Sequence, residues 1–330
     1  MKIKYIVNGV SKTSVPKRWS DYINREEFGM RVDMVVINEQ IKLLFKREKE
    51  EYIAHGHHIK AMALFLLFNL FLRKKTIYTL HGSYQFLSKT NKILLSFIFN
   101  YVERIVFVNR VVYDELPKDI KVKIANRCDI ILNGIEKSYI YNKIDVYKKF
   151  KINESDETIF HPARFVREKN HLNLIDAMKT VVEHNSKAKL LLAGSGELED
   201  EIRNRVRELN LGDSVVFLGL ISRDEVYCFL ERCDLFVMPS ISEGLNIAFL
   251  EAVSMKSKVL VSDIESFRYP FVHYNIDARE FNIRFVNPKD SSLIAKGIEE
   301  SLKKEKNIDF DFSKFSLKNM VLEYQKIYKR

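Results

Sequence analysis

Glycine, proline and cysteine are all scarce in this chain of 330 residues, which contains 11 Gly, 6 Pro and 3 Cys. So few glycines and prolines exclude a collagen-like or low-complexity architecture. Three cysteines cannot form a disulfide framework, and none stands in a C-x-x-C or Cys/His pattern that would predict a zinc site. The first residues enter a strand-like segment without the apolar core of a signal peptide, so we expect a cytoplasmic protein.

The sequence also lacks a hydrophobic run of membrane-spanning length. Its longest run, residues 61–72, has 12 residues, whereas a bilayer requires about 20. Because this run is apolar all round, it predicts a helix buried against a sheet. Residues 60–110 contain eight Lys or Arg and one acidic residue, which leaves open a peripheral contact with the anionic inner face of the plasma membrane.

Acidic residues are too few in the first half of the chain to balance the basic ones. The net charge is +10, and residues 1–150 hold 27 Lys or Arg against 15 Asp or Glu, while the remainder is close to neutral. This asymmetry favours an anionic partner for the first half, either a phosphorylated substrate, a membrane surface or a nucleic acid. Ordinary solubility charge is the alternative interpretation.

Apolar runs of strand length alternate with longer helical patterns, as is typical of βαβ units and parallel sheets. We therefore predict an α/β fold with two doubly wound domains, residues 1–145 and 146–314, joined near residues 139–151. A helix is expected at 39–50, among others. The expected strands are 4–8, 32–37, 52–54, 76–80, 104–108, 129–132, 158–162, 189–193, 214–218, 234–238, 258–262 and 282–286.

A basic loop follows the strand expected at 158–162. It carries Arg164 and Lys169, and open α/β sheets bind ligands where their strands end. Arg offers a bidentate fork and Lys a point charge, so the two could hold a diphosphate from both sides. A solvated surface loop is the alternative.

Two carboxylates follow the strand expected at 234–238. Glu243 should lie at the N-terminus of a helix that starts near Leu245, and Glu251 should lie within that helix. Carboxylates accept hydrogen bonds from sugar hydroxyls, and the backbone N–H groups of residues 244–246 could bind an anion or further hydroxyls. Alternatively, the first carboxylate only favours the helix dipole and the second is a surface residue.

Several other patterns have weaker implications. Gly194-Ser195-Gly196 lacks the third glycine of a dinucleotide fingerprint, and Asp309-x-Asp311 lies in a late polar stretch that we interpret as surface charge. His81-Gly82 places a polar side chain at a strand end. The cluster His55, His57 and His58 has no carboxylate nearby and stays unassigned.

Taken together, these motifs resemble the glycosyltransferase group 1 family, which is family 4 of the retaining GT-B glycosyltransferases. The resemblance is strongest over residues 160–262 and moderate over 76–136. It implies a GT-B fold with two Rossmann-like domains facing an interdomain cleft, and a terminal helix, 315–330, that packs back on the first domain. The motifs are A-R-F-V-R-E-K-N at 163–170, L-L-A-G-S-G at 191–196, V-V-F-L-G at 215–219, D-L-F-V-M-P-S at 234–240, E-G-L-N-I-A-F-L-E-A at 243–252, L-H-G at 80–82 and L-N-G-I-E at 132–136.

The resemblance implies a hexosyltransferase-type enzyme of class EC 2.4. Such an enzyme would move a sugar, with retention, from a nucleotide-diphosphate sugar to a lipid-linked or growing glycan in bacterial surface polysaccharide synthesis (O-antigen, capsule or lipopolysaccharide). A nucleotide-sugar epimerase of the same fold is one alternative. A non-enzymatic nucleic-acid-binding protein is another, but no recognition motif in the sequence supports it.

The resemblance also assigns roles to individual residues. Arg164 and Lys169 would neutralise the departing diphosphate without a metal, Glu243 would bind sugar hydroxyls, Glu251 would hold the ribose, and His81 would face the reacting sugar from the first domain. The implied catalytic residues are thus Glu243, Arg164, Lys169 and His81. The implied donor-binding residues are Arg164, Lys169, Gly219, Ile221, Glu243, Gly244, Leu245, Asn246 and Glu251.

Overall fold

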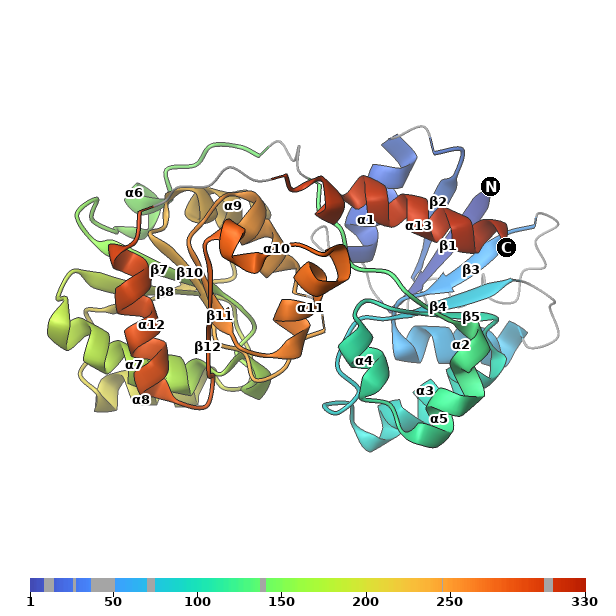
Figure 1. Ribbon diagram of the computed structural model, residues 1–330, viewed down its shortest axis with the longest axis horizontal. Coiled ribbons are helices and arrows are strands. Elements are labelled where there is room, and N and C mark those ends of the chain that lie inside the picture. Colours follow the sequence, from blue (N-terminus) through green and yellow to red (C-terminus); the bar gives the residue numbers. More distant parts are fainter. Residues whose placement is uncertain are drawn as a thin grey trace. The chain divides into compact units, whose positions relative to one another are not determined.

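The computed structural model describes residues 1–8, 15–25, 28–36, 51–69, 75–136, 141–244, 246–305 and 311–330. The helix predicted at 39–50 lies outside these residues. The chain divides into two compact units, Met1–Asn133 together with Leu317–Arg330, and Gly134–Ser316 (Figure 1). Each unit contains one six-stranded sheet.

The sheet of the N-terminal unit is entirely parallel, in the order β2-β1-β3-β4-β5-β6. Its order reverses between β1 and β3, and such a switch point is where doubly wound sheets bind ligands. The strands are β1 (Lys2–Val7), β2 (Arg31–Val36), β3 (Ile53–Gly56), β4 (Thr76–Leu80), β5 (Arg104–Phe107) and β6 (Cys128–Ile130). The helices are α1 (Val15–Arg25), α2 (Ile59–Asn69), α3 (Lys89–Tyr101), α4 (Arg110–Asp114), α5 (Lys118–Ile124) and α13 (Leu317–Lys329).

Both faces of this sheet are covered by helices. On β1, Ile6 packs into a core with α2 and α3, whereas Tyr5 packs into a second core with Trp19 of α1 and Tyr324 of α13. Figure 1 shows α13 in red, lying across the strands. Burial on both faces explains consecutive apolar residues within a strand, such as Ile105, Val106 and Phe107 of β5, all of which are buried.

Residues 61–69 of the apolar run form most of α2, as predicted. Ala61, Met62 and Phe65 are buried against the sheet and α3, while Leu67 and Phe68 near the end of the helix remain exposed. Among the described residues, none of the helices combines the length and the apolar character needed to traverse a bilayer.

The sheet of the C-terminal unit is also parallel, in the order β12-β11-β10-β7-β8-β9. Its switch point lies between β7 and β10. The strands are β7 (Glu157–Pro162), β8 (Ala188–Ala193), β9 (Val215–Gly219), β10 (Leu235–Met238), β11 (Val259–Ser262) and β12 (Ile283–Val286). The helices are α6 (Val146–Phe150), α7 (His171–His184), α8 (Glu199–Glu208), α9 (Arg223–Arg232), α10 (Ile247–Ser254), α11 (Glu265–Tyr274) and α12 (Ser291–Lys303).

Helices cover this sheet on both faces as well. α7, α8 and α12 bury Leu174, Ile202 and Ile298 against one face, and Figure 1 shows α7 beside α12. Elsewhere in the unit, Phe229 of α9 stacks on Phe160 of β7, with 5.0 Å between ring centroids. All twelve predicted strands are present, with ends within two residues of those expected.

The segment predicted to join the domains packs on the C-terminal unit where it is described. Residues 146–150 form α6, the Tyr147 hydroxyl lies 2.6 Å from Thr158 Oγ1, and Lys149 pairs with Glu225. The C-terminal unit accordingly begins at Gly134, whereas the sequence suggested a boundary between residues 145 and 146.

Candidate active site

Two loops meet at the switch point of the C-terminal sheet, one after β7 and one after β10. Asn170 Nδ2 donates to the Pro239 carbonyl at 2.9 Å, and the Ile241 N–H donates to the Glu168 carbonyl at 2.8 Å. Asn170 has a left-handed backbone with φ of 60°, which asparagine tolerates better than most residues. The basic loop and the acidic loop are therefore held side by side.

Lys169 and Glu243 form an ion pair at this point. Lys169 Nζ lies 2.5 Å from Glu243 Oε1, and the two side chains are only 13% and 8% exposed. The same oxygen also accepts from Ser240 Oγ at 2.7 Å and from Asn246 Nδ2 at 3.0 Å. No described residue donates to Oε2, so the carboxylate retains one oxygen for a ligand.

The residues around Glu243 are fixed by the start of α10. Asn246 caps the helix, since its Oδ1 accepts from the Phe249 N–H at 3.1 Å while its Nδ2 bonds Glu243. The helix consequently begins at Ile247 rather than at Leu245, which lies outside the described residues. Gly244 is buried beside this cap.

Arg164 contrasts with Lys169. It is exposed, and within the described ranges its side chain makes no hydrogen bond or ion pair. The backbone of its loop packs closely against Gly194 and Gly196, where a side chain would not fit. An added Cβ would lie 2.0 Å from the Ala163 carbonyl oxygen at Gly194 and 2.4 Å from the Phe165 carbonyl oxygen at Gly196. The broken dinucleotide motif thus positions the backbone that carries Arg164.

Glu251 is buried in α10 and bound by residues from α9. Its Oε1 accepts from the Tyr227 hydroxyl at 3.2 Å and lies 3.5 Å from an Arg223 guanidinium nitrogen. Neither partner was predicted from the sequence. The Ser222–Glu225 capping box could have revealed them, because it sets the start of α9 and places residues 223 and 227 one turn apart on one face.

Gly219 ends β9 and Ile221 lies two residues beyond it, at the same edge of the sheet. Gly219 has φ of 66°, and its carbonyl accepts from the Gly194 N–H at 2.9 Å. Its positive φ favours glycine at this position. Ile221 is half-buried.

Two buried histidines lie close to Lys169. His161 Nδ1 donates to the Val237 carbonyl at 2.8 Å, and the His161 and His171 rings are 4.6 Å apart. Burial lowers the pKa of His161 to about 4 and that of His171 to about 2. Both rings are therefore neutral near pH 7, and Lys169 contributes the positive charge here.

His81 lies in the N-terminal unit, after β4, and lines a cavity of roughly 390 Å³. Its Nε2 lies 3.0 Å from Nδ1 of His57, which follows β3. Burial lowers the pKa of His81 to about 4. His57 had no predicted role, because its partner is another histidine rather than a carboxylate.

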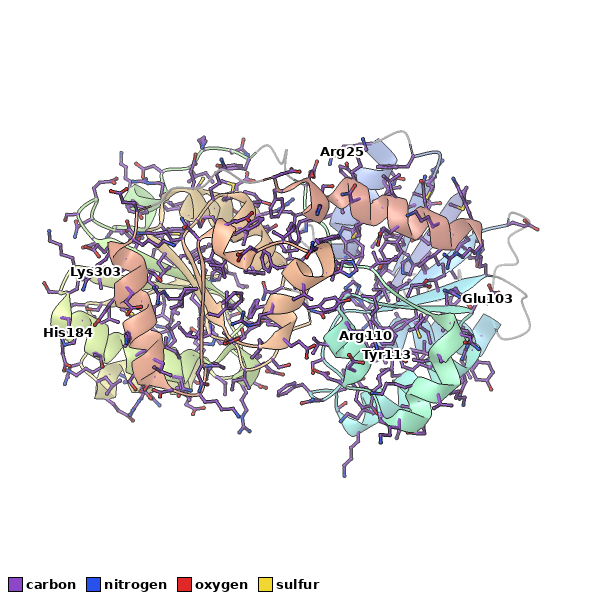
Figure 2. The ribbon with its side chains drawn as sticks, viewed as in Figure 1. Arg25, Glu103, Arg110, Tyr113, His184 and Lys303 are labelled. Carbon is purple, nitrogen blue, oxygen red and sulfur yellow. The ribbon has the colours of Figure 1, made fainter. Side chains whose placement is uncertain are left out.

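A second cavity, of about 380 Å³, lies where α7 and α12 end; His184 and Lys303, labelled in Figure 2, line it together with Glu157. Because Glu157 begins β7, this cavity is at the opposite end of the sheet from Lys169. Within the part of the chain that the structure describes, no three His, Cys, Asp or Glu side chains gather as metal ligands. Asp309 lies outside that part, and Asp311 accepts from the Ser313 N–H and hydroxyl.

Residues 142–314, just over half of the chain, match the family described as glycosyl transferases group 1. The chain belongs to this family. Residues 28–139 match a second description, glycosyltransferase family 4. The group 1 match includes every residue predicted for the site except His81, which falls within the family 4 match.

Named relatives of this group 1 chain include two bacterial enzymes. Alpha-monoglucosyldiacylglycerol synthase of Streptococcus pneumoniae is 27% identical over 176 residues, which are 51% of this chain and 39% of that protein. The Campylobacter jejuni N-acetylgalactosamine-N,N'-diacetylbacillosaminyl-diphospho-undecaprenol 4-alpha-N-acetylgalactosaminyltransferase is 27% identical over 183 residues, 55% of this chain and 47% of that protein. The chain thus spans less than half the length of these curated relatives.

The similarity to solved structures extends over the whole chain. The crystal structure of Anabaena HepE in complex with UDP-glucose is 16% identical and has a TM-score of 0.77, covering 100% of this chain and 99% of that one. The family and the GT-B fold with two Rossmann-like units, both predicted from the motifs, are confirmed.

Proposed function

We propose that the chain is a retaining hexosyltransferase that moves a sugar from a nucleotide-diphosphate sugar to a lipid-linked or growing glycan of a bacterial surface polysaccharide. The observation that carries this proposal is the cluster at the β7–β10 switch point, where Lys169 and Glu243 pair beside the loop of Arg164. Family membership supports the reaction class. The acceptor class is supported by the relatives, whose names include a glucosyl lipid synthase and a transferase acting on an undecaprenol-linked glycan.

The donor would bind along the carboxyl edge of the C-terminal sheet. Arg164 is exposed and without a described partner, so its guanidinium is available for bidentate contact with a diphosphate. Glu251, held by Arg223 and Tyr227, would bind the ribose. The backbones of residues 244–246 and 219–221 would contact the sugar and the base, respectively. HepE, which binds UDP-glucose, supports a donor of this chemical class.

The chemical step requires stabilisation of the diphosphate as its bond to the sugar breaks. Arg164 and Lys169 would supply two positive charges, which is the reason to expect transfer without a divalent metal. Glu243 would bind sugar hydroxyls through Oε2, because its Oε1 already accepts from three donors. His81 would contact the same sugar from the N-terminal unit.

The basic N-terminal half would serve the acceptor. Its excess of Lys and Arg, together with Leu67 and Phe68 exposed near the end of α2, suits a peripheral contact with an anionic bilayer that presents a lipid-linked substrate.

A transfer assay tests the proposed function. The protein is incubated with UDP-, GDP- and other activated sugars and with a diphospho-undecaprenol-linked acceptor, and product, free nucleotide and anomeric configuration are measured. We expect transfer with retention for one donor, and no loss of activity with EDTA. If no donor is bound, hydrolysed or transferred, the proposal is wrong; conversion of a donor to an isomer without free nucleotide would indicate an epimerase instead.

Two matched variants test whether Arg164 binds the diphosphate specifically or only adds to the positive charge of the loop. Arg164 and Arg167 are both exposed on the loop after β7. Arg164→Gln should reduce turnover about 100-fold, as expected for loss of an electrostatic catalytic group. Arg167→Gln should leave turnover nearly unchanged. Equal effects of the two substitutions would contradict the role given to Arg164.

A further inference from the structure

His57 and His81 form a pair beside the switch point of the N-terminal sheet. They follow the neighbouring parallel strands β3 and β4, so both lie at the carboxyl edge. His57 Nδ1 and His81 Nε2 are 3.0 Å apart, and both residues line the cavity of roughly 390 Å³. Because no acidic side chain takes part in this contact, one imidazole must donate to the other.

Aromatic side chains hold the pair in place. The Trp19 ring lies 5.7 Å from the His57 ring and 5.6 Å from the His81 ring, and Tyr5 packs 4.5 Å from His57. Burial holds the pKa of His57 well below its usual value and lowers the pKa of His81 to about 4. Each ring is therefore neutral near pH 7 and carries one proton.

The position of each proton follows from the outer nitrogen of His57. His57 Nε2 is buried and has no hydrogen-bond partner among the described residues. If His81 donated, the His57 proton would be on Nε2 and would be an orphaned buried donor. If His57 donates, Nε2 carries only a lone pair. Orphaned buried N–H groups are rarer in proteins than under-satisfied acceptors, so the second arrangement is favoured.

We propose that His57 is a positioning residue: its Nδ1–H donates to Nε2 of His81 and thereby holds His81 as the Nδ1–H tautomer. His81 then offers a neutral hydrogen-bond donor, rather than a base, to the cavity. The ligand group that fits this donor is an oxygen acceptor, such as a hydroxyl of a sugar. The catalytic part of this inference rests on the proposed function, but the tautomer does not.

Nitrogen-15 NMR of the histidine-labelled full chain tests the tautomer without any activity. Two histidines act as internal references. His161 must carry its proton on Nδ1, because its partner is the Val237 carbonyl, and neutral His58 must carry it on Nε2, because its Nδ1 accepts from the Asn8 N–H at 2.9 Å. We expect His81 to show the pattern of His161 at neutral pH. The pattern of His58 would overturn the proposal.

Three substitutions of His57 test whether the tautomer of His81 affects turnover. Asn can still donate near the Nδ1 position, ionised Asp can only accept, and Leu does neither. We expect His57→Asn to retain the Nδ1–H tautomer of His81 and turnover within about 3-fold. His57→Asp should convert His81 to the Nε2–H tautomer, and both Asp and Leu should lower turnover about 10-fold or more, because a donor to the substrate is lost or misplaced.

The outcomes distinguish this inference from the proposed function. Equal turnover of folded Asn and Asp variants would overturn the positioning role. If Asp or Leu fails to fold, the spectra of wild type and His57→Asn still decide the tautomer. An inactive chain with the Nδ1–H pattern contradicts only the proposed function, whereas an active chain with the Nε2–H pattern contradicts only this inference.

Discussion

Replacing Glu243 with glutamine measures how strongly the switch-point ion pair stabilises the C-terminal unit. Glutamine still offers an acceptor to Ser240 and Asn246, but it removes the charge that faces Lys169, whose side chain is only 13% exposed. Breaking a fully buried pair costs about 3–5 kcal/mol, and some solvent reaches this one, so we expect a loss of about 2–3 kcal/mol in unfolding free energy. In a unit of this size, that loss lowers Tm by roughly 4–12 °C.

The assay is thermal unfolding followed by circular dichroism, in a double-mutant cycle of Glu243→Gln and Lys169→Met. The double variant should recover part of the loss, because no cation is then left unpaired. Glu199→Gln is the matched control, since its pair with Arg203 is exposed on α8 and should contribute less than about 0.5 kcal/mol. If Glu243→Gln lowers Tm no more than Glu199→Gln does, the reasoning about desolvation is refuted.

Three further predictions concern the loop glycines, acid stability and membranes. Gly194→Ala should lower the free energy of unfolding, measured with urea, by about 3 kcal/mol or more, because φ is 150° and the new Cβ would meet the Ala163 carbonyl oxygen. Gly212 has open space around it, so Gly212→Ala should change the free energy of unfolding by less than about 0.5 kcal/mol. Equal losses in the two variants would contradict the close approach at Gly194. Because the pKa of His171 is about 2 when folded and the ordinary value is 6.5, the unfolded state binds more protons below pH 6.5, and this histidine alone lowers the free energy of unfolding by about 1.4 kcal/mol per pH unit as pH falls. His171→Phe should make this dependence shallower, as measured by urea unfolding at several pH values; an unchanged slope would argue against a neutral buried ring. The protein should sediment with anionic vesicles at low salt and be released at high salt, and equal sedimentation with neutral vesicles would exclude an electrostatic contact.

The strands could be predicted because strands covered on both faces are continuous apolar runs. The run at 235–238, Leu-Phe-Val-Met, is an example, since all four of its residues are apolar and buried. The boundary between the units could not be predicted in the same way. The Lys-rich stretch that suggested a linker contains Tyr147, whose hydroxyl bonds Thr158 inside the C-terminal unit, and a contact of this kind leaves no pattern in the sequence.

The candidate site was predictable in its residue types but not in its pairings. Strand ends and motif order indicated Lys169 and Glu243 as separate ligands of the donor, whereas the structure shows them bound to each other. Side-chain pairing across two loops depends on how β7 and β10 lie together, and residue spacing does not contain that information. The same holds for His57, whose partner becomes adjacent only when β3 and β4 pair.

Trp19 is the only tryptophan in the chain, and it is buried against His57 and His81 of the N-terminal cavity. Tryptophan fluorescence therefore comes from a single site, and the Trp19 ring packs directly on His81, the residue proposed to contact the sugar. The intrinsic fluorescence of Trp19 is thus a probe of this cavity: a change in its emission when an acceptor or donor is added would report binding there without an introduced dye.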